Sequence, residues 1–254
     1  MVTPARYGPA ARWAVLAAAI LLGAPADAAA QDRGNPDWHY VVHPTLWFSN
    51  VDGEVTLDEA ELVVGDSTLQ AAFYGSVEVG KGRWRGIGTF RTTGISGTTE
   101  VELDGPLGDV MADYDFDLTV AELFAAVEFG SFETNHAFEF LGGLRYVRHA
   151  LDVGVDIGTQ VTREDWIEPV AGARYYAEMG RLFWATIDGN IGGFGIGSDI
   201  SWVVAGTLGV RITRHIDATL AMRYYQTEFH DDATGYRIQE GVSQGWHIGL
   251  RWKG

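Results

Sequence analysis

The sequence contains no cysteine among its 254 residues, so no disulfide bond supports the fold. If the chain is exported, it must then be held by a packed core or by a membrane. After residue 30 no stretch approaches eighteen consecutive apolar residues, which excludes a transmembrane helix. Apolar residues also almost never recur at helical spacing after residue 37. These absences indicate a chain built mainly of strands.

Basic residues are scarce, since 18 Lys and Arg stand against 34 Asp and Glu. Near the start, Arg6 and Arg12 precede the apolar run 13–24 and the small residues 28–30, the pattern of a secretory signal peptide. The run is too short to cross about 30 Å of hydrocarbon, so we expect cleavage after Ala30 rather than a membrane anchor. The predicted parts are a signal peptide over 1–30, a short segment over 31–37 and one barrel domain over 38–252.

The chain that remains after cleavage carries 16 basic and 33 acidic residues, because the first thirty residues contain only two basic and one acidic residue. Its net charge is therefore −17. A nucleic-acid partner would need a basic surface, so this balance argues strongly against one.

Alternation of apolar and polar residues, punctuated by glycine, is abundant and predicts strands to the end of the chain. The predicted strands have 11 to 16 residues, well above the five or six usual in soluble sheets. This length suffices for the ~9 to 11 tilted residues that cross a bilayer. Ten strands are predicted, near 38–50, 69–79, 83–94, 115–129, 137–152, 164–178, 182–192, 200–212, 216–228 and 240–252.

The connections between these strands alternate in length. Outer-membrane barrels have an even strand number, short periplasmic turns and longer extracellular loops. The rhythm therefore predicts an all-β, transmembrane, antiparallel up-and-down barrel of about ten strands, with 8 or 12 as alternatives. Short connections are expected at 80–82, 130–136, 179–181 and 213–215, long ones at 51–68, 95–114, 153–163 and 229–239, and a compact one at 193–199.

The two faces of the strands differ in chemistry. In the strand near 216–228, Leu220 and Met222 share one side, whereas Asp217 and Arg223 lie on the other. A soluble barrel would place the apolar side inward around a ligand, but the polar side here holds too many charges for an apolar cup. A membrane barrel places the apolar side toward lipid, and the charges pair inside a hydrated lumen. The predicted lumen charge network is Glu78, Arg85, Arg91, Glu139, Arg145, Glu168, Arg174, Asp188, Arg211, Arg223 and Arg251.

Aromatic residues gather near the predicted strand ends, as girdles at two membrane interfaces would. The alternative is a set of scattered core aromatics. The periplasmic girdle is predicted to contain Trp38, Trp84, Trp184 and Trp252, and the opposite one Phe48, Phe90 and Trp202.

The segment 189–202 reads GNIGGFGIGSDISW and raises the question of a phosphate-binding loop. A dinucleotide site needs G-x-G-x-x-G at the start of a helix, and the residues that follow here have no helical stripe. Glycines allow positive φ and a sharp reversal, so a compact outer turn is predicted. We expect Phe194 and Ile196 to cover the rim or enter the outer leaflet. The turn motif consists of Gly192, Gly193, Phe194, Gly195, Gly197, Ser198 and Asp199.

Several segments between Trp38 and Trp252 resemble an uncharacterised family of small proteobacterial outer-membrane β-barrel proteins. In that family the glycine-rich stretch commonly reads D-x-G-G-F-G-x-G-S-D-x-x-W. Asn190 stands here where the first Asp is usual, and we expect Asp188 to take its place in the lumen. The resemblance implies a barrel in the outer membrane of a Gram-negative bacterium and implies no activity. Further matching segments are 46–47, 52–53, 82–84, 143–146, 166–169, 172–175 and 223–225.

Three functions remain open. The first is a structural or narrow-pore barrel, since about ten strands enclose a lumen far smaller than that of 16- to 18-stranded porins. The second is a surface binding protein, because the outer segments 51–68 and 98–117 carry many acids and no basic residue. Oxygen-only clusters suit Ca²⁺, although no segment has the spacing of a calcium loop.

The third is a hydrolase with a rim site built from His230, Asp231, Asp232 and Asp199. No nucleophile or metal motif accompanies these residues, so we assign no catalytic residue, no metal and no cofactor. The expected partners are outer-membrane lipid and lipopolysaccharide, the barrel-assembly machinery during insertion, and weakly bound divalent cations at the acidic segments.

Overall fold

The computed structural model describes residues 37–57, 60–64, 68–69, 72–101, 110–129, 136–155, 158–231 and 236–254. The predicted signal peptide over 1–30 and nearly all of the segment 31–37 lie outside the described residues. All regular structure in the described part is β-strand. No helix among these residues is long and apolar enough to cross a membrane.

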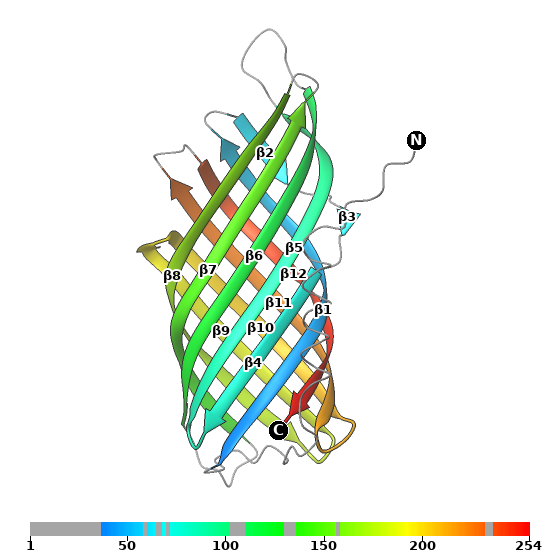
Figure 1. Ribbon diagram of the computed structural model, residues 1–254, viewed down its shortest axis with the longest axis vertical. Helices are drawn as coiled ribbons and strands as arrows, with labels where there is room; N and C mark the ends of the chain where they lie inside the picture. The colour runs from blue at the N-terminus through cyan, green and yellow to red at the C-terminus, as the bar shows by residue number, and fades with distance from the viewer. Residues whose placement is uncertain are drawn as a thin grey trace.

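Ten antiparallel strands close into a tilted barrel, with β12 returning to pair with β1 (Figure 1). Two short strands lie off the ring: β2 pairs with the upper end of β1, and β3 pairs with β5. The strands are β1 (Trp38–Leu57), β2 (Ala60–Val64), β3 (Thr68–Leu69), β4 (Ala72–Lys81), β5 (Trp84–Val101), β6 (Val110–Phe129), β7 (His136–Val155), β8 (Gly158–Met179), β9 (Phe183–Ile196), β10 (Ser198–Arg211), β11 (Ile216–Asp231) and β12 (Tyr236–Lys253).

The predicted barrel of ten strands is confirmed, but the four long connections are wrong as loops. The strands continue through most of these segments: β5 runs to Val101, β7 to Val155, and β8 has 22 residues. Figure 1 shows β5 to β8 rising furthest at one end, while the β9–β10 hairpin ends lower on the left. The two ends of the barrel therefore differ greatly in height.

A belt of the barrel near the short turns is apolar outside and polar inside. On β9, Phe183, Ile187 and Ile191 are exposed, while Trp184 and Asn190 are buried in the lumen. Exposed outward residues of this kind occur on every barrel strand within the belt. A surface this apolar is unusual in water and matches the lipid-facing band of a membrane barrel. Its members include Leu46, Val77, Trp84, Leu123, Phe140, Leu144, Ile167, Ile187, Val204, Leu208, Leu220, Met222, Trp246 and Leu250.

Above this belt the pattern inverts, and the same strands become apolar inside and polar outside. On β6, Glu122 points inward and Leu123 points outward. Further up the same strand, Phe116 is buried inside and Asp115 is exposed outside. β7 changes likewise, from buried Arg145 to buried Val147 and Leu151. The upper part thus has the pattern of a barrel in water. An outward apolar pattern ends at this inversion, so it does not predict the strand extensions above it.

The inward residues of the upper part form one apolar core, which we call the cap. Trp166 stacks on Phe229 with ring centroids 4.1 Å apart, and Phe229 contacts Tyr236 at 6.1 Å. The cap contains Ile95, Ala112, Tyr114, Phe116, Leu118, Val120, Val147, Leu151, Trp166, Phe229, Tyr236 and Ile238.

A β-bulge helps β12 to contribute to the cap. The register with β11 shifts between Thr227 and Phe229, so that Thr227 pairs with Gly241 but Phe229 pairs with Ile238. The extra residue on β12 reverses which side chains point inward, as bulges do. Tyr236 and Ile238 are therefore buried above the bulge, whereas Ser243 and His247 are buried below it.

The aromatic girdle is correct in part. Trp38 and Trp84 are exposed near the short turns, and Phe48 is exposed at the other edge of the belt. Trp184 is the exception, because it occupies an inward position of β9 and is buried. Its indole Nε1 donates to Asp217 Oδ2 at 2.9 Å, so this residue belongs to the lumen.

The orientation of the barrel can be tested by cysteine labelling in this cysteine-free chain. Asp165 is exposed on the outside of the upper part, and Lys81 is exposed beside a short turn. On intact cells an impermeant thiol reagent should label Asp165→Cys and spare Lys81→Cys, whereas both should react after lysis. Labelling of Lys81→Cys alone on intact cells would show that the barrel is inserted the other way round.

Candidate functional site

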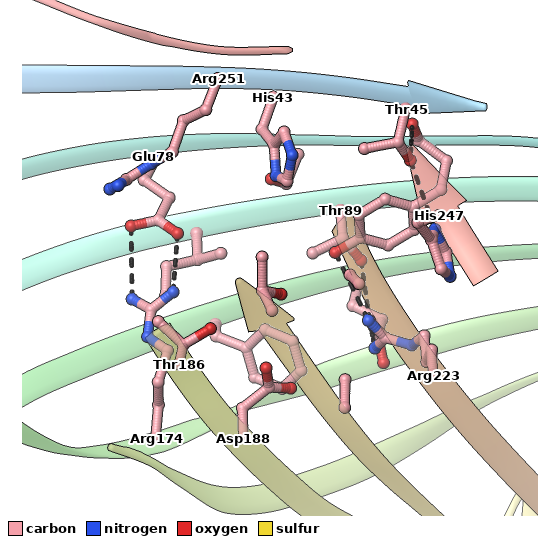
Figure 2. Close-up of a pocket in the computed structure, with 18 of the residues that line it drawn as sticks. His43, Thr45, Glu78, Thr89, Arg174, Thr186, Asp188, Arg223, His247 and Arg251 are labelled. Atoms are coloured by element: carbon pink, nitrogen blue, oxygen red, sulfur yellow. Dashed lines mark hydrogen bonds and ion pairs between the residues drawn. The ribbon is translucent and has the colours of Figure 1, made fainter. Parts of the chain in front are cut away.

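The lower lumen is crossed by a chain of ion pairs centred on Arg174 of β8. Its Nη1 lies 2.7 Å from Glu78 Oε1, and its Nε lies 2.6 Å from Glu139 Oε2 (Figure 2 shows the pair with Glu78). Glu139 also contacts Arg85 Nη1 at 3.0 Å, and Arg85 pairs with Glu128. Five strands, β4 to β8, are joined across this level.

The upper lumen is organised around Arg145 of β7, which is fully buried. Its Nε donates to Glu122 Oε1 at 2.8 Å, and its Nη1 donates to Glu168 Oε1 and to Ser201 Oγ, both at 2.7 Å. Its Nη2 donates to Asn190 Oδ1. One guanidinium thus ties β6, β8, β9 and β10 to β7, which suits the fixed fork of arginine donors.

Glu168 is the acceptor at the centre of this upper group. Besides Arg145, it accepts hydrogen bonds from Ser201 Oγ at 2.5 Å, from Trp166 Nε1 at 3.1 Å and from Ser198 Oγ. Trp166 also belongs to the cap, so this carboxylate joins the polar lumen to the apolar core above it.

The glycine-rich segment is the compact turn between β9 and β10, as predicted. Positive φ angles occur at Gly193 (87°), Phe194 (55°), Gly195 (75°) and Gly197 (80°). A Cβ on Gly197 would lie 2.7 Å from the carbonyl oxygen of Ile167, so only glycine lets the turn rest against β8. This close approach places Ser198 on Glu168. The motif therefore completes the lumen, and a strand rather than a helix follows it.

Phe194 and Ile196 are exposed at the tip of the turn. That they cover the rim or enter the outer leaflet stays a prediction.

A cavity of ≈ 110 Å³ lies between the lower and upper groups. Figure 2 shows Arg174 and Arg223 on either side of it, with Asp188 between them. The volume matches about three or four water molecules at ≈ 30 Å³ each. Within the described part of the chain, Asp188 forms no ion pair and no hydrogen bond, so its carboxylate faces this hydrated chamber.

The predicted lumen residues fall at distinct levels. Arg223 reaches Glu122 at 3.3 Å above the chamber, and Arg251 lies 3.7 Å from Asp217 near the mouth beside the short turns. Arg211 lies at the mouth itself, where it pairs with Glu178 at 2.5 Å and is partly exposed. Asp188 does not replace the usual acid of the motif, since Asn190 itself binds Arg145.

Several lumen residues were missed in the sequence. Glu122 joins Arg145 to Arg223, Glu128 pairs with Arg85, and Lys253 Nζ lies 2.9 Å from Asp217 Oδ1. The period-two phase of β6 alone would have placed Glu122 and Glu128 inward, because both alternate with outward apolar residues. Asn190 carries no charge and gave no such signal.

The rim pair suggested for hydrolysis is partly assembled. His230 Nδ1 lies 2.7 Å from Asp199 Oδ2 on the outer surface, and both side chains are almost half exposed. Asp232 lies outside the described residues. Ser198, the neighbouring hydroxyl, is buried and donates to Glu168 rather than to His230. The hydrolase with a rim site stays a prediction.

The outer face of the upper barrel is acidic along β6 and β7. Asp113, Asp115 and Asp117 point outward, and Asp115 stands directly opposite Asp152 in the register. Partial burial, followed by repulsion from Asp115 and Asp152, raises the pKa of Asp117. Among the described residues, no group of three or more His, Asp or Glu is placed to hold a metal ion.

No protein-family model matches the chain, and no curated protein sequence matches it. Solved structures with similar folds are outer-membrane barrels. The attachment invasion locus protein Ail of Yersinia pestis is 10% identical, with coverage of 86% of this chain and 99% of that one, and a TM-score of 0.39. The NalP translocator domain from Neisseria meningitidis is 11% identical (96% and 95%, TM-score 0.41), and OprG from Pseudomonas aeruginosa is 14% identical (88% and 99%, TM-score 0.36).

The geometry defines the class of the protein. An even number of antiparallel strands, short turns at one end, tall hairpins at the other and an outward apolar belt are the features of outer-membrane β-barrels. The chain is such a barrel, and its lumen is polar and crossed by ion pairs.

The stability of the lower group can be tested with two arginines of the same strand. Arg174 is buried among carboxylates, whereas Arg163 is exposed on the outside of β8. Arg174→Ala leaves Glu78 and Glu139 without their main partner, so we expect a loss of ~1 to 3 kcal/mol of unfolding free energy, between exposed and fully buried pairs. Arg163→Ala should cost under about 0.5 kcal/mol. Equal urea midpoints for both variants and the parent would rule out a structural role for these ion pairs.

Proposed function

We propose that the protein is a closed, structural barrel of the outer membrane rather than an open pore. The observation that carries this proposal is the succession of barriers along the lumen. From the periplasmic side these are the ion pairs at Asp217, the Arg174 group, the small chamber, the Arg145 group and the apolar cap. A solute would have to displace each of them.

The cap supports closure at the extracellular end. Its residues come from β5, β6, β7, β8, β11 and β12, so side chains of the tall hairpins pack against one another inside the upper barrel. Apolar interiors are packed densely, and a constriction lined by apolar side chains excludes water and ions. An open porin would instead keep a polar interior along its full height.

Direct charge pairing supports closure at the middle of the membrane. Charges that line a conducting pore must face water, whereas Arg145, Glu139 and Glu168 are buried and paired with one another or with neighbouring strands. The chamber between the groups has room for only a few water molecules. We therefore expect conductance limited to rare openings.

The signal-peptide pattern over 1–30 and the apolar belt support export and insertion into the outer membrane of a Gram-negative bacterium. The partners implied are the barrel-assembly machinery during insertion, then outer-membrane lipid and lipopolysaccharide. The acidic outer face with Asp113, Asp115 and Asp152 favours weak contacts with the divalent cations that accompany lipopolysaccharide.

Single-channel recording of the refolded mature chain tests the proposal. The parent protein should give no steady conductance. Phe116→Ala with Phe229→Ala removes cap packing, and Arg145→Ala with Glu168→Ala removes the upper pair. The Arg174 group and the ion pairs at Asp217 remain in these variants, so we expect brief openings to become more frequent when all four changes are combined, without steady conductance. Each variant should first show the heat-dependent gel shift of a folded barrel. A steady ohmic current through the parent protein would overturn the proposal in favour of a narrow pore.

A further inference from the structure

Arg91 of β5 is a buried cation that makes no ion pair or hydrogen bond with the described residues. Its side chain is 2% exposed, and its Nε, Nη1 and Nη2 atoms have no hydrogen-bond partner in the part of the chain that the structure describes. Arginine carries five N–H donors and stays charged in proteins. Leaving such a group unsatisfied and unpaired costs several kcal/mol, so a partner outside the chain is expected.

Two aromatic rings contact this guanidinium but leave its N–H donors without a hydrogen-bond acceptor. Its Cζ lies 4.1 Å from the centre of the Tyr225 ring and 5.8 Å from that of Trp47. Stacking of this kind uses the face of the guanidinium and leaves its N–H edges free to bind something else. The two rings therefore fix the orientation of the N–H edge of Arg91, as neighbouring side chains do in a binding site.

The groups nearest Arg91 are mostly donors or further cations. Arg145 and Arg223 share Glu122, and Glu168 is the other carboxylate of this level. Arg91, Arg145 and Arg223 thus lie near two carboxylates, and Asn190 contributes only a neutral amide. A third carboxylate, Asp188, lies in the chamber between Arg174 and Arg223 and makes no ion pair among the described residues.

Other orphaned polar atoms lie in the same layer. Trp47 Nε1 has no hydrogen-bond partner among the described residues, and the same holds for both ring nitrogens of His149. Trp47 and His149 are almost completely buried. An indole can only donate, and a neutral imidazole donates from one nitrogen. These donors therefore have no acceptor among the described residues.

We propose that the layer beside Arg91 binds one small monovalent anion of the halide class, such as chloride. A monovalent ion matches the single charge of the Arg91 guanidinium, which makes no hydrogen bond among the described residues. A halide accepts hydrogen bonds from several directions, so it satisfies the Arg91 edge together with neighbouring donors. The ion is a structural component of the closed lumen.

Urea unfolding of the refolded protein tests the site, with sodium chloride exchanged for sodium gluconate at constant ionic strength. The folding equilibrium constant should rise about tenfold for each tenfold increase in chloride above the Kd, because only the folded state binds. Arg91→Met should abolish this dependence. Asn190→Asp should weaken it, since the new carboxylate supplies negative charge beside Arg145. Asp188→Asn is the matched control and should retain it.

Crystals of the parent protein grown with bromide give a readout that does not depend on the folding of any variant. An anomalous peak within hydrogen-bonding distance of Arg91 is the expected result. Identical unfolding in chloride and gluconate, together with no bromide peak, would overturn the inference and leave the Arg91 edge bound to water alone. A chloride effect that survives Arg91→Met would place the anion elsewhere.

Discussion

The hydrogen-bonded ion pair between Arg145 and Glu168 is the contact on which most of the structure depends. It lies at the level where the barrel changes from a membrane protein to a barrel in water. Arg145 connects five strands, and Glu168 receives donors from the glycine-rich hairpin and from a tryptophan of the cap. Charges this deeply buried are tolerated only when every partner is in place, so the pair imposes the positions of its neighbours.

The inversion of the two faces follows from the change of solvent along each strand. Within the membrane the outside must be apolar, and the inside is left to polar groups that satisfy one another. Above the membrane the outside meets water, and the inside of tall hairpins is free to pack as an ordinary core. The cap and the ion-paired lumen are therefore two solutions to one requirement, which is to fill a narrow barrel without leaving unpaired polar groups. Closure of the lumen results from both.

Much of the fold was predictable because the alternation has a period of two. The inward phase places Glu139, Arg145, Glu168 and Arg174 in the lumen, and the structure adds the register, with Arg145 opposite Glu168 and Glu139 opposite Arg174. The upper halves of the strands were missed because their alternation has the opposite sense. Contacts across the lumen were also out of reach: Glu78 and Arg174 meet although β4 and β8 are not neighbours. Such pairs depend on the diameter and tilt of the closed barrel, which no local pattern encodes.

The glycine-rich turn shows the same limit at smaller scale. Its glycines predict a sharp reversal of the chain. The hydrogen-bond partner of Ser198, however, depends on how closely the turn approaches β8. Arg91 was placed in the lumen by its phase, yet the absence of an ion-pair partner for it is visible only once its neighbours in space are known. Sequence patterns thus define which residues face the lumen, and the closed structure decides which of them pair.

A double-mutant cycle between Arg145 and Glu168 measures directly whether this ion pair stabilises the closed lumen. Unfolding free energies would be measured for the parent, Arg145→Met, Glu168→Gln and the double variant in one lipid system. We expect a coupling energy of ~1.5 to 3 kcal/mol, because each single change leaves a buried charge without its partner. A coupling energy near zero would show that the two side chains are hydrated and do not stabilise each other. That result would contradict a lumen held closed by ion pairs.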